Sequence, residues 1–393
     1  MRQVWKIIAI ILLAAIEFGA AMYLDRNPRK VASETMQRLP RETVAITEQT
    51  ESVFAVATES SLPAEITLPP ETTLPPETTL PPQTQAREER FLLTFVGDCT
   101  LGSSPSNYYA DVGFVKTVGE DYGYPFRNVI QYFEQDHATF LNLEGALTDE
   151  GNPMGKKHAF RGPEAFVNIL TENSVEFASL ANNHTGDYGE IGYTNTKKVL
   201  DNAGVPYVER DASALVTLEC GLKIGVYGTV YYNLDVPDME QEIRALKDQG
   251  AELVIVAAHW GNEGSYRATE KQKTVGRAAI DAGADIVWGS HPHVLQPIEE
   301  YNGGVIYYSL GNFSFGGNTA PKDLDSAIVT QEVIRDAQGN ISLGSRSVIP
   351  VCVSSSEWGN NFQPTPYDEE VRAYTRVMEK IEGTYEGRDL PIE

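Results

Sequence analysis

The chain is predicted to contain one large α/β domain, and three observations predict it. Short apolar runs recur between glycine and polar residues, helical patterns separate several of them, and roughly 300 residues of this kind are enough for a large core. Alternating strands and helices favour a sheet with helices outside it. The runs that we expect to form buried strands are FLLTFV, ATFLNL, EFASLA, KIGVYG, LVIVAAH, DIVWG and VIYYSLG.

Helices are predicted between these strands, over residues 164–172, 193–203, 238–249 and 270–282. Gly250 and Gly283 follow the last two, and glycine is the usual residue just past a helix end. After Pro350 the chain turns polar, with one further helix expected over 367–383. We therefore divide the folded part into a domain of residues 91–350 and a C-terminal extension of residues 351–393.

The N-terminal residues 1–26 are predicted to form a signal anchor, a transmembrane helix that stays attached. Arg2 and Lys6 precede the apolar run IIAIILLAAI, and the apolar residues after Glu17 bring the segment to about the twenty residues that cross a bilayer. Basic residues ahead of the run place the N-terminus in the cytoplasm and the C-terminal domain outside the cell. A cleaved secretory signal, which would release the protein, remains an alternative because Gly19-Ala20-Ala21 resembles a cleavage site.

Residues 27–90 have a different composition, dominated by Pro, Thr and Glu, and the sequence LPPETT occurs twice. Such a segment cannot bury a core. Proline pairs favour polyproline II, so we expect a disordered, semi-rigid linker that holds the domain away from the membrane.

The charge and the cysteines exclude two classes of protein. A formal net charge of −24 argues against nucleic acid as a partner, because that binding needs clustered Lys and Arg. It also makes a polyanionic substrate unfavourable unless metal cations or a basic patch offset the repulsion. With three cysteines at least one is unpaired, so disulfides do not form the framework.

Five polar clusters carry the chemistry. They are Gly97-Asp98, Asn142-Leu143-Glu144, Asn182-Asn183-His184, His259-Trp260-Gly261 and Gly289-Ser290-His291-Pro292-His293. Each follows an apolar run, which places it on a loop at a strand end, where open α/β sheets build their sites. Two neighbouring cations need a bridging carboxylate and further nitrogen or oxygen ligands, which these clusters supply. The mixture of carboxylate, amide and imidazole suits Mn, Fe or Zn better than Ca.

The stretches around these clusters resemble one family. FVGDCTLG, FLNLEGALT, SLANNHTGDYG, VAAHWGNE, GADIVWGSHPHVLQP and IYYSLGNFSF are similar to the CapA or PgsA group, the poly-γ-glutamate capsule synthesis proteins of the calcineurin-like metallophosphoesterase superfamily. Six motifs in the family's order make a specific signal. The resemblance implies a four-layer α/β/β/α sandwich, in which two sheets pack face to face between helices.

The resemblance also implies a ligand set for two divalent metal ions. Asp98 and His293 would hold the first metal, and Glu144 would bridge. The second metal would be held by Asn183, His259 and His291.

Other residues near these ligands receive supporting roles. His184 matches the histidine that acts as general acid, and Arg161 matches a position that could clamp a phosphate or carboxylate, with a plain salt bridge as the alternative. Asn142 is expected to orient Glu144, and Asn312 to close a turn near the site. Glu263 and Asp187 could support the ligands or be merely solvated.

Two departures from the superfamily pattern leave a single metal as an alternative. Thr100 stands where the superfamily has a histidine ligand, and Glu144 bridges where aspartate is usual. Pro292 is predicted to keep the histidine pair extended, because proline disfavours helical angles in the residue before it.

We therefore expect a membrane-anchored, extracytoplasmic protein of poly-γ-glutamate capsule or envelope polymer synthesis or export, with a metal-dependent hydrolase site of the phosphoesterase type. Its expected partners are an anionic polymer or phosphorylated envelope substrate, capsule synthase or export subunits, and the membrane itself. The alternative is a non-catalytic anchored scaffold, or a polymer-binding subunit of such a complex.

Overall fold

The computed structural model describes residues 88–156, 158–231 and 235–391. The predicted anchor at 1–26 and the predicted linker up to residue 87 lie outside the described residues. Within the described part of the chain, no helix is both long enough and apolar enough to cross a membrane.

Strands of the first sheet follow the order β16-β15-β14-β1-β2-β5-β6, and β13 also pairs with β1. The central pairs β1–β2, β2–β5 and β1–β13 are parallel, whereas β14 and β15 form a long antiparallel hairpin. The strands are β1 (Glu89–Thr100), β2 (Ala138–Leu143), β5 (Phe177–Ser179), β6 (Tyr207–Val208), β13 (Asn312–Phe315), β14 (Asp325–Arg335), β15 (Ile341–Cys352) and β16 (Thr365–Pro366).

The second sheet has the order β11-β12-β10-β9-β8-β7, and its inner strands β8, β9, β10 and β12 are parallel. Its strands are β7 (Ala212–Thr217), β8 (Lys223–Val230), β9 (Leu253–His259), β10 (Ile286–Ser290), β11 (Ile298–Tyr301) and β12 (Gly304–Tyr307). A short pair, β3 (Ala146–Leu147) and β4 (Arg161–Gly162), stands apart from both sheets.

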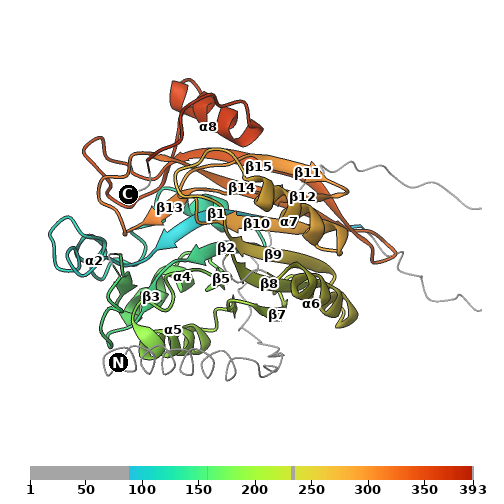
Figure 1. Ribbon diagram of the computed structural model, residues 1–393, viewed down its shortest axis with the longest axis horizontal. Helices are drawn as coiled ribbons and strands as arrows, with labels where there is room; N and C mark the ends of the chain where they lie inside the picture. The colour runs from blue at the N-terminus through green and yellow to red at the C-terminus, as the bar shows by residue number, and fades with distance from the viewer. Residues whose placement is uncertain (1–87, 157, 232–234, 392–393) are drawn as a thin grey trace, which may run out of the picture. The chain divides into compact units, whose positions relative to one another are not determined.

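Helices lie outside the sheets (Figure 1). They are α2 (Phe114–Val118), α3 (Ile130–Phe133), α4 (Val167–Thr171) after a 3-10 turn (Glu164–Phe166), α5 (Gly189–Ala203), α6 (Val236–Asp248), α7 (Glu270–Asp281) and α8 (Arg372–Glu382).

Three hydrophobic clusters define the layers. The central one joins residues of both sheets, such as Phe95 and Phe140 of the first and Ile255 and Trp288 of the second. The Trp288 Nε1–H donates to the Val96 carbonyl at 3.0 Å and ties the sheets together. A second cluster packs α2 to α5 on the outer face of the first sheet, and a third packs α6 and α7 on the second. The α/β prediction is confirmed, and the order helix, sheet, sheet, helix is the one that the resemblance implied.

The predicted helix starts agree best with the observed ones where the N-terminal residues form strong caps. Helix α6 begins after Asp235, whose carboxylate accepts from the Asp238 N–H, and α7 begins with a reciprocal capping box of Thr269 and Gln272. Helix α5 begins four residues earlier than predicted, at Gly189. Glycine lowers helix propensity, but Gly192 packs so tightly that a Cβ there would lie 2.6 Å from the Tyr188 side chain.

The β14–β15 hairpin was not predicted. Its turn is fixed by Asp336, whose side chain accepts from the backbone N–H groups of Gln338 and Asn340, while Gly339 takes a φ of 86°. Strand β15 runs through residue 350, so the expected extension 351–393 continues the first sheet. The signal was present as polar and apolar alternation on either side of a DAQGN turn.

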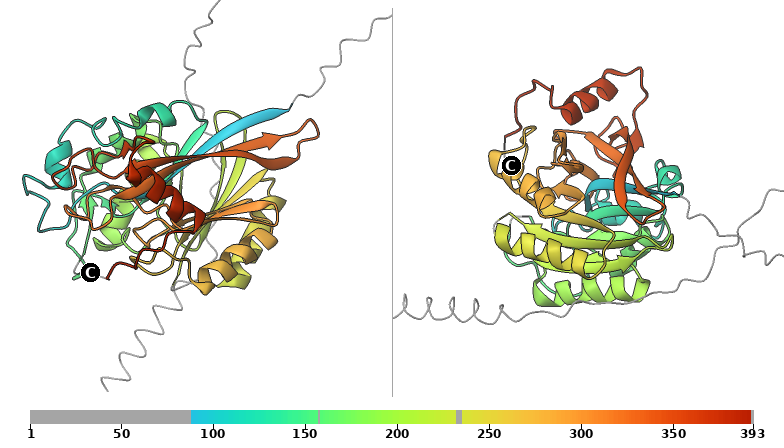
Figure 2. Two further views of the ribbon diagram at one scale, coloured as in Figure 1. Left: turned by 90° about the horizontal axis from the view of Figure 1, so that it is seen from above. Right: turned by 90° about the vertical axis from the view of Figure 1, so that its right-hand side faces the viewer.

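Helix α8 lies across β14 and β15 (Figure 2) and places Val377 and Ile381 in the central core. The buried ammonium of Lys380 donates to Asp323 at 2.7 Å and to Asp325 at 2.6 Å. Arg376 binds both oxygens of Asp325 at 2.6 Å. Lys380 and Asp325 are buried, whereas Arg376 is partly exposed, and the pairing of these charges fixes the position of the helix.

All three cysteines carry free thiols, as the odd count required of at least one. Cys99 lies fully buried beside Asp98, and burial raises the pKa of its thiol well above the usual value. It therefore behaves as a small apolar residue of the core.

Candidate metal centre

Strand register brings the first site residues together. Asp98 of β1 stands opposite both Asn142 of β2 and Asn312 of β13. The Asn142 Nδ2–H donates to Asp98 Oδ1 at 2.9 Å, so Asn142 orients Asp98, whereas we expected it to orient Glu144. The other oxygen, Asp98 Oδ2, lies 3.1 Å from His293 Nδ1 and accepts from the His291 N–H at 3.2 Å. Asp98 thus holds the histidine turn to the end of β1.

The second sheet contributes His259, the last residue of β9, which is paired in register with Ser290. Its Nδ1 forms a hydrogen bond with the Ser290 hydroxyl at 2.9 Å, and its Nε2 forms one with Asn183 Oδ1 at 2.8 Å. The ring is fully buried, and its orientation is fixed from both sides. His259 and Asn183 therefore come together as the predicted ligands of one metal would.

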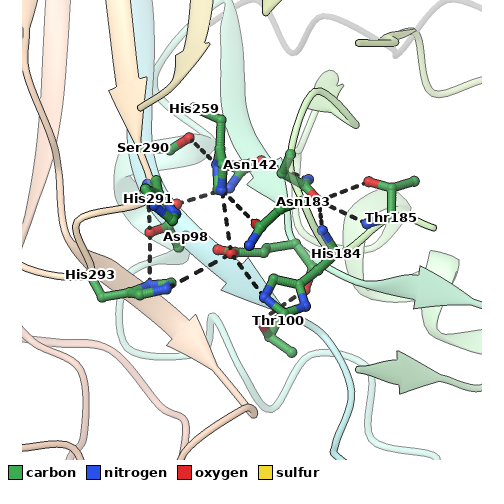
Figure 3. A network of polar contacts seen from close by, with 12 residues as sticks. Asp98, Thr100, Asn142, Asn183, His184, Thr185, His259, Ser290, His291 and His293 are labelled. Carbon is green, nitrogen blue, oxygen red and sulfur yellow. Dashed lines mark hydrogen bonds and ion pairs between the residues drawn. The ribbon is translucent and has the colours of Figure 1, made fainter. Parts of the chain in front are cut away.

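The Glu144 carboxylate lies among His184, His259 and His293, which Figure 3 labels. Its Oε1 is 3.7 Å from His259 Nε2, 3.9 Å from His293 Nε2 and 3.9 Å from His184 Nε2. The carboxylate is completely buried, yet neither oxygen has a hydrogen-bond partner among the described residues. Buried polar groups are almost always paired, so this one is arranged for a group that binds from outside the chain.

The protonation states fit a cation. Burial, with the nearby Asp98 charge, raises the pKa of Glu144 well above its usual value. Burial disfavours the charge on His293, but the Glu144 and Asp98 carboxylates outweigh it and raise the pKa of His293 to about 10. A proton on His293 therefore partly offsets the two acids, which a metal ion would do more fully.

The other two histidines predicted to bind metal, His259 and His291, favour the neutral form. Burial, helped by the neighbouring His293, lowers the pKa of His291 to about 4, and burial also lowers that of His259 well below its usual value. The buried His291 Nδ1 has no hydrogen-bond partner among the described residues. Neutral imidazole is the form that binds metals.

The histidine turn differs from the prediction that Pro292 keeps it extended. His291 has a φ of 97° and His293 a φ of 56°, so both adopt the left-handed region, which residues with a side chain rarely occupy. The preference that proline imposes is overridden by the hydrogen bond from the His291 N–H to Asp98 and by the packing of Tyr231 on the His291 ring, 5.2 Å away. Such strain is typical of functional sites.

Two groups of residues, all buried except the partly exposed His293, place their ligand atoms within 4.8 Å of one another. They share Glu144, as a bridging role requires; one adds His291 and His293, and the other adds Asp98 and His259. The chemistry of these donors, together with the unpartnered oxygens of Glu144, fits a divalent cation. Which ligand belongs to which ion, and whether two ions bind, stay predictions.

His184 forms a pair with Asp187, the acid whose role the sequence left open. His184 Nδ1 forms a hydrogen bond with Asp187 Oδ2 at 2.7 Å, which directs Nε2 toward Glu144. Lys156 donates to Asp187 Oδ1 at 2.6 Å, and the Phe160 N–H donates to Oδ2. The spacing of three residues between a histidine and an acid was the signal that could have found this pair.

Arg161 makes its side-chain contacts with residues other than the predicted metal ligands. Its guanidinium stacks on the rings of Tyr108 and Tyr188, with centroids at 4.9 and 4.8 Å, and donates to the Glu150 carbonyl at 3.5 Å. These contacts differ from the plain salt bridge that was the alternative reading. Its role as a clamp stays a prediction.

Two positioning residues were missed by sequence reasoning. Ser290 holds the His259 ring, and Asn182 donates to Asn142 Oδ1 at 3.0 Å while its own Oδ1 accepts from the His184 N–H. Both lie inside the predicted clusters, but their side-chain directions depend on tertiary packing. Asn312 forms a hydrogen bond with His293 Nδ1 at 3.0 Å, close to the metal ligands as expected.

A cleft of about 470 Å³ opens beside the site. His184, His293 and Asn312 line it, so the general-acid candidate and one metal-ligand candidate both face the space where a substrate would lie. Further wall residues are Phe160, Glu263, Phe315, Asn318, Lys322 and Leu390.

Comparison with known proteins identifies the family. The model of the bacterial capsule synthesis protein PGA_cap matches residues 92–317, more than half of the chain. The chain belongs to this family. The match includes every predicted metal ligand.

Two members of the family from Bacillus are similar over most of the folded part. The capsule biosynthesis protein CapA of Bacillus anthracis is 32% identical over 281 residues, which cover 63% of this chain and 65% of that one. The PGA biosynthesis protein CapA of Bacillus subtilis (strain 168) is 30% identical over 280 residues, covering 64% of this chain and 70% of that one. The matched region thus spans about two-thirds of the length of these relatives.

Among solved structures, the NAD nucleotidase of Haemophilus influenzae aligns with 70% of this chain and 54% of its own, at 13% identity and a TM-score of 0.40. A likeness of that size carries no argument about activity. The residues described above, and not this likeness, support a metal centre.

Proposed function

We propose that this capsule synthesis family member is a metal-dependent hydrolase of the phosphoesterase type. The observation that carries the proposal is the buried Glu144 carboxylate, which has no hydrogen-bond partner among the described residues and is surrounded by imidazole nitrogens within 4 Å. Without a ligand for this group, the protein would hold a buried acid that His293 compensates only in part, which is unfavourable.

Two divalent cations, from among Mn, Fe and Zn, are the proposed cofactors. They would be held by Asp98, Glu144, Asn183, His259, His291 and His293, with Glu144 between them. When bound, such ions polarise a phosphoryl oxygen and activate water for attack.

His184 is the proposed general acid. Asp187 binds its Nδ1, so Nε2, the nitrogen that faces the site, is the atom through which the ring would exchange a proton with a leaving group. Lys156 pairs with Asp187, which balances the charge of the acid. A histidine oriented by a buried carboxylate is a recurring arrangement for proton transfer.

The proposed substrate is a phosphorylated envelope polymer, and poly-γ-glutamate, which the family and the Bacillus relatives suggest and which has no phosphoester bond, is proposed as an anionic polymer that the protein binds. Because the chain has a formal charge of −24, an anionic polymer would depend on the metal ions for its attraction. We also propose that residues 1–26 anchor the protein to the cell membrane with the domain outside, beside capsule synthase or export subunits.

Metal content and turnover test the proposal together. The purified protein should contain about two metals per chain by mass spectrometry and hydrolyse a chromogenic phosphodiester. Asn183→Ala and His291→Ala should lower both. His137→Ala is the matched control, because this exposed histidine accepts from the Leu92 N–H far from the site in the fold. Full turnover in the two site variants would refute the hydrolase.

A non-catalytic scaffold is the second candidate, and Thr100 favours it. At this position, where the superfamily has a histidine ligand, the Thr100 hydroxyl donates instead to the Glu144 carbonyl at 2.9 Å. The residue thus holds the backbone of the central acid and leaves the first metal with one ligand fewer. Metal-free protein that still captures its membrane partners, equally well with Asn183→Ala, would support the scaffold.

A further inference from the structure

We propose that residues 385–390, here called the strap, are a positioning element for the turn His291-Pro292-His293, and that Asp389 is its main anchor. The proposal rests on the proposed function only in taking this turn to bind metal. It concerns a segment outside the six motifs and outside the matched region 92–317.

Asp389 fastens the strap to the loop that follows His259. Its Oδ2 accepts from the Ser265 hydroxyl at 2.9 Å, while Oδ1 accepts from the Tyr266 N–H at 3.2 Å and from Arg267 Nη1 at 2.9 Å. Arg267 also donates to the Gly387 carbonyl at 3.0 Å. One carboxylate therefore binds three consecutive residues of the loop, which fixes its backbone more firmly than a single exposed ion pair would.

The strap reaches the histidine turn through two backbone hydrogen bonds in series. The Leu390 N–H donates to the Gly264 carbonyl at 2.9 Å, and the Gly264 N–H donates to the Pro292 carbonyl at 2.8 Å. Contact at Gly264 is close, because a Cβ there would lie 2.7 Å from the Leu390 carbonyl oxygen, and its φ is 73°. Glycine is needed at this position for both reasons.

The turn needs support from both sides. His291 and His293 adopt φ values of 97° and 56°, which cost free energy unless the surroundings impose them. On one side, Asp98 accepts from the His291 N–H. On the other, Gly264 binds the carbonyl of the intervening Pro292. The strap is the outer layer that holds Gly264 in place.

The strap also forms part of the cleft wall. Leu390 and Pro391 line the same space as His184 and His293, and so do Glu263 and Gly264 of the fastened loop. Movement of the strap would therefore change both the histidine turn and the space available to a substrate. Buried glutamines support the loop from inside, since Gln296 donates to the Ser265 carbonyl at 2.8 Å, so the loop should persist when the strap is released.

Asp389→Ala in the full-length protein tests the proposal, with the neighbouring exposed Arg388→Ala as matched control. Two measurements are made: the dissociation constant for Mn²⁺ by calorimetry, and amide hydrogen exchange over residues 289–295 in chelator. We expect Asp389→Ala to weaken Mn²⁺ binding by about threefold to tenfold, the range for loss of a few exposed polar contacts, and to speed exchange of the turn. Asp389→Asn keeps one acceptor oxygen, so its Mn²⁺ affinity and its exchange rates should lie between those of Asp389→Ala and Arg388→Ala.

Leu390→Pro gives an independent check, because proline lacks the N–H that donates to Gly264. It should reproduce both effects of Asp389→Ala. Affinity and exchange in both variants equal to those of Arg388→Ala would overturn the proposal. If the wild-type protein binds no metal, the proposed function fails, whereas the exchange measurement in chelator still decides whether the strap holds the turn.

Discussion

Replacing Glu144 by glutamine should make the protein more stable without metal and less stable with it. In the wild-type protein the buried Glu144 carboxylate lies near Asp98, and both Glu144 oxygens lack a hydrogen-bond partner among the described residues. An unsatisfied buried polar group costs about 1–3 kcal/mol, and more when it is charged. A neutral amide of the same shape, with donors that can reach the Asp98 carboxylate, should recover about 2 kcal/mol.

Bound metal should make the wild-type protein the more stable of the two. At a free metal concentration one thousand times the dissociation constant, the wild-type protein gains about 4 kcal/mol, whereas a variant that binds much more weakly gains little. In Mn²⁺ the free energy of unfolding of the wild-type protein should therefore exceed that of Glu144→Gln by about 2 kcal/mol. In chelator it should be lower than that of the variant by about 2 kcal/mol. For a domain of this size each kcal/mol shifts the melting temperature by roughly 2 °C.

The assay is denaturant unfolding of wild type, Glu144→Gln and the exposed-surface control Glu172→Gln, each in chelator and in Mn²⁺. The control should follow wild type in both conditions, because Glu172 is exposed at the end of α4. A Glu144→Gln variant that is less stable than wild type in chelator would refute the reasoning, since the carboxylate would then be satisfied without metal. Equal stabilisation of both proteins by Mn²⁺ would refute a ligand role for Glu144.

Three further predictions concern protons and catalysis. Metal affinity should rise with pH by about tenfold per unit or more below pH 10, because a bound cation displaces protons from His293, whose pKa is raised to about 10, and from Glu144, whose pKa is also raised. Calorimetry in buffers of different ionisation enthalpy should detect about one released proton or more, and a pH-independent affinity would contradict this. Burial raises the pKa of Asp136 to about 7, above its unfolded value, so the folded state holds the proton and stability falls as pH rises from about 4 to 7. Asp136→Asn should remove that fall, which is worth at most about 4 kcal/mol in urea unfolding at pH 8. Identical pH profiles for the two proteins would show that the carboxyl titrates normally. Asp187→Asn should lower turnover by about a hundredfold, because the substitution loosens the His184 ring. Metal content by mass spectrometry should stay at the wild-type level, because Asp187 is not a proposed ligand. Turnover equal to that of the wild-type protein would remove His184 from the mechanism.

The sequence by itself determined the central strands and the ligand clusters. Buried parallel strands such as LVIVAAH are continuous apolar runs, and their ends are marked by the first polar side chain, so both strand and site can be found by inspection. Helices with strong caps, such as α7 with Thr269 and Gln272, were equally accessible. These features are local, because a few neighbouring residues carry the whole signal.

Tertiary structure decided which atoms meet. That Asp98 pairs with Asn142, that Ser290 orients His259, and that Asp187 orients His184 depend on strand register and loop packing, which no local pattern specifies. The left-handed conformations of His291 and His293 oppose the local preference set by Pro292, and contacts with Asp98, the Tyr231 ring and Gly264 hold them in place. Contacts between distant parts of the chain outweigh local propensity at the site, which is why the polar clusters could be found in the sequence and their geometry could not.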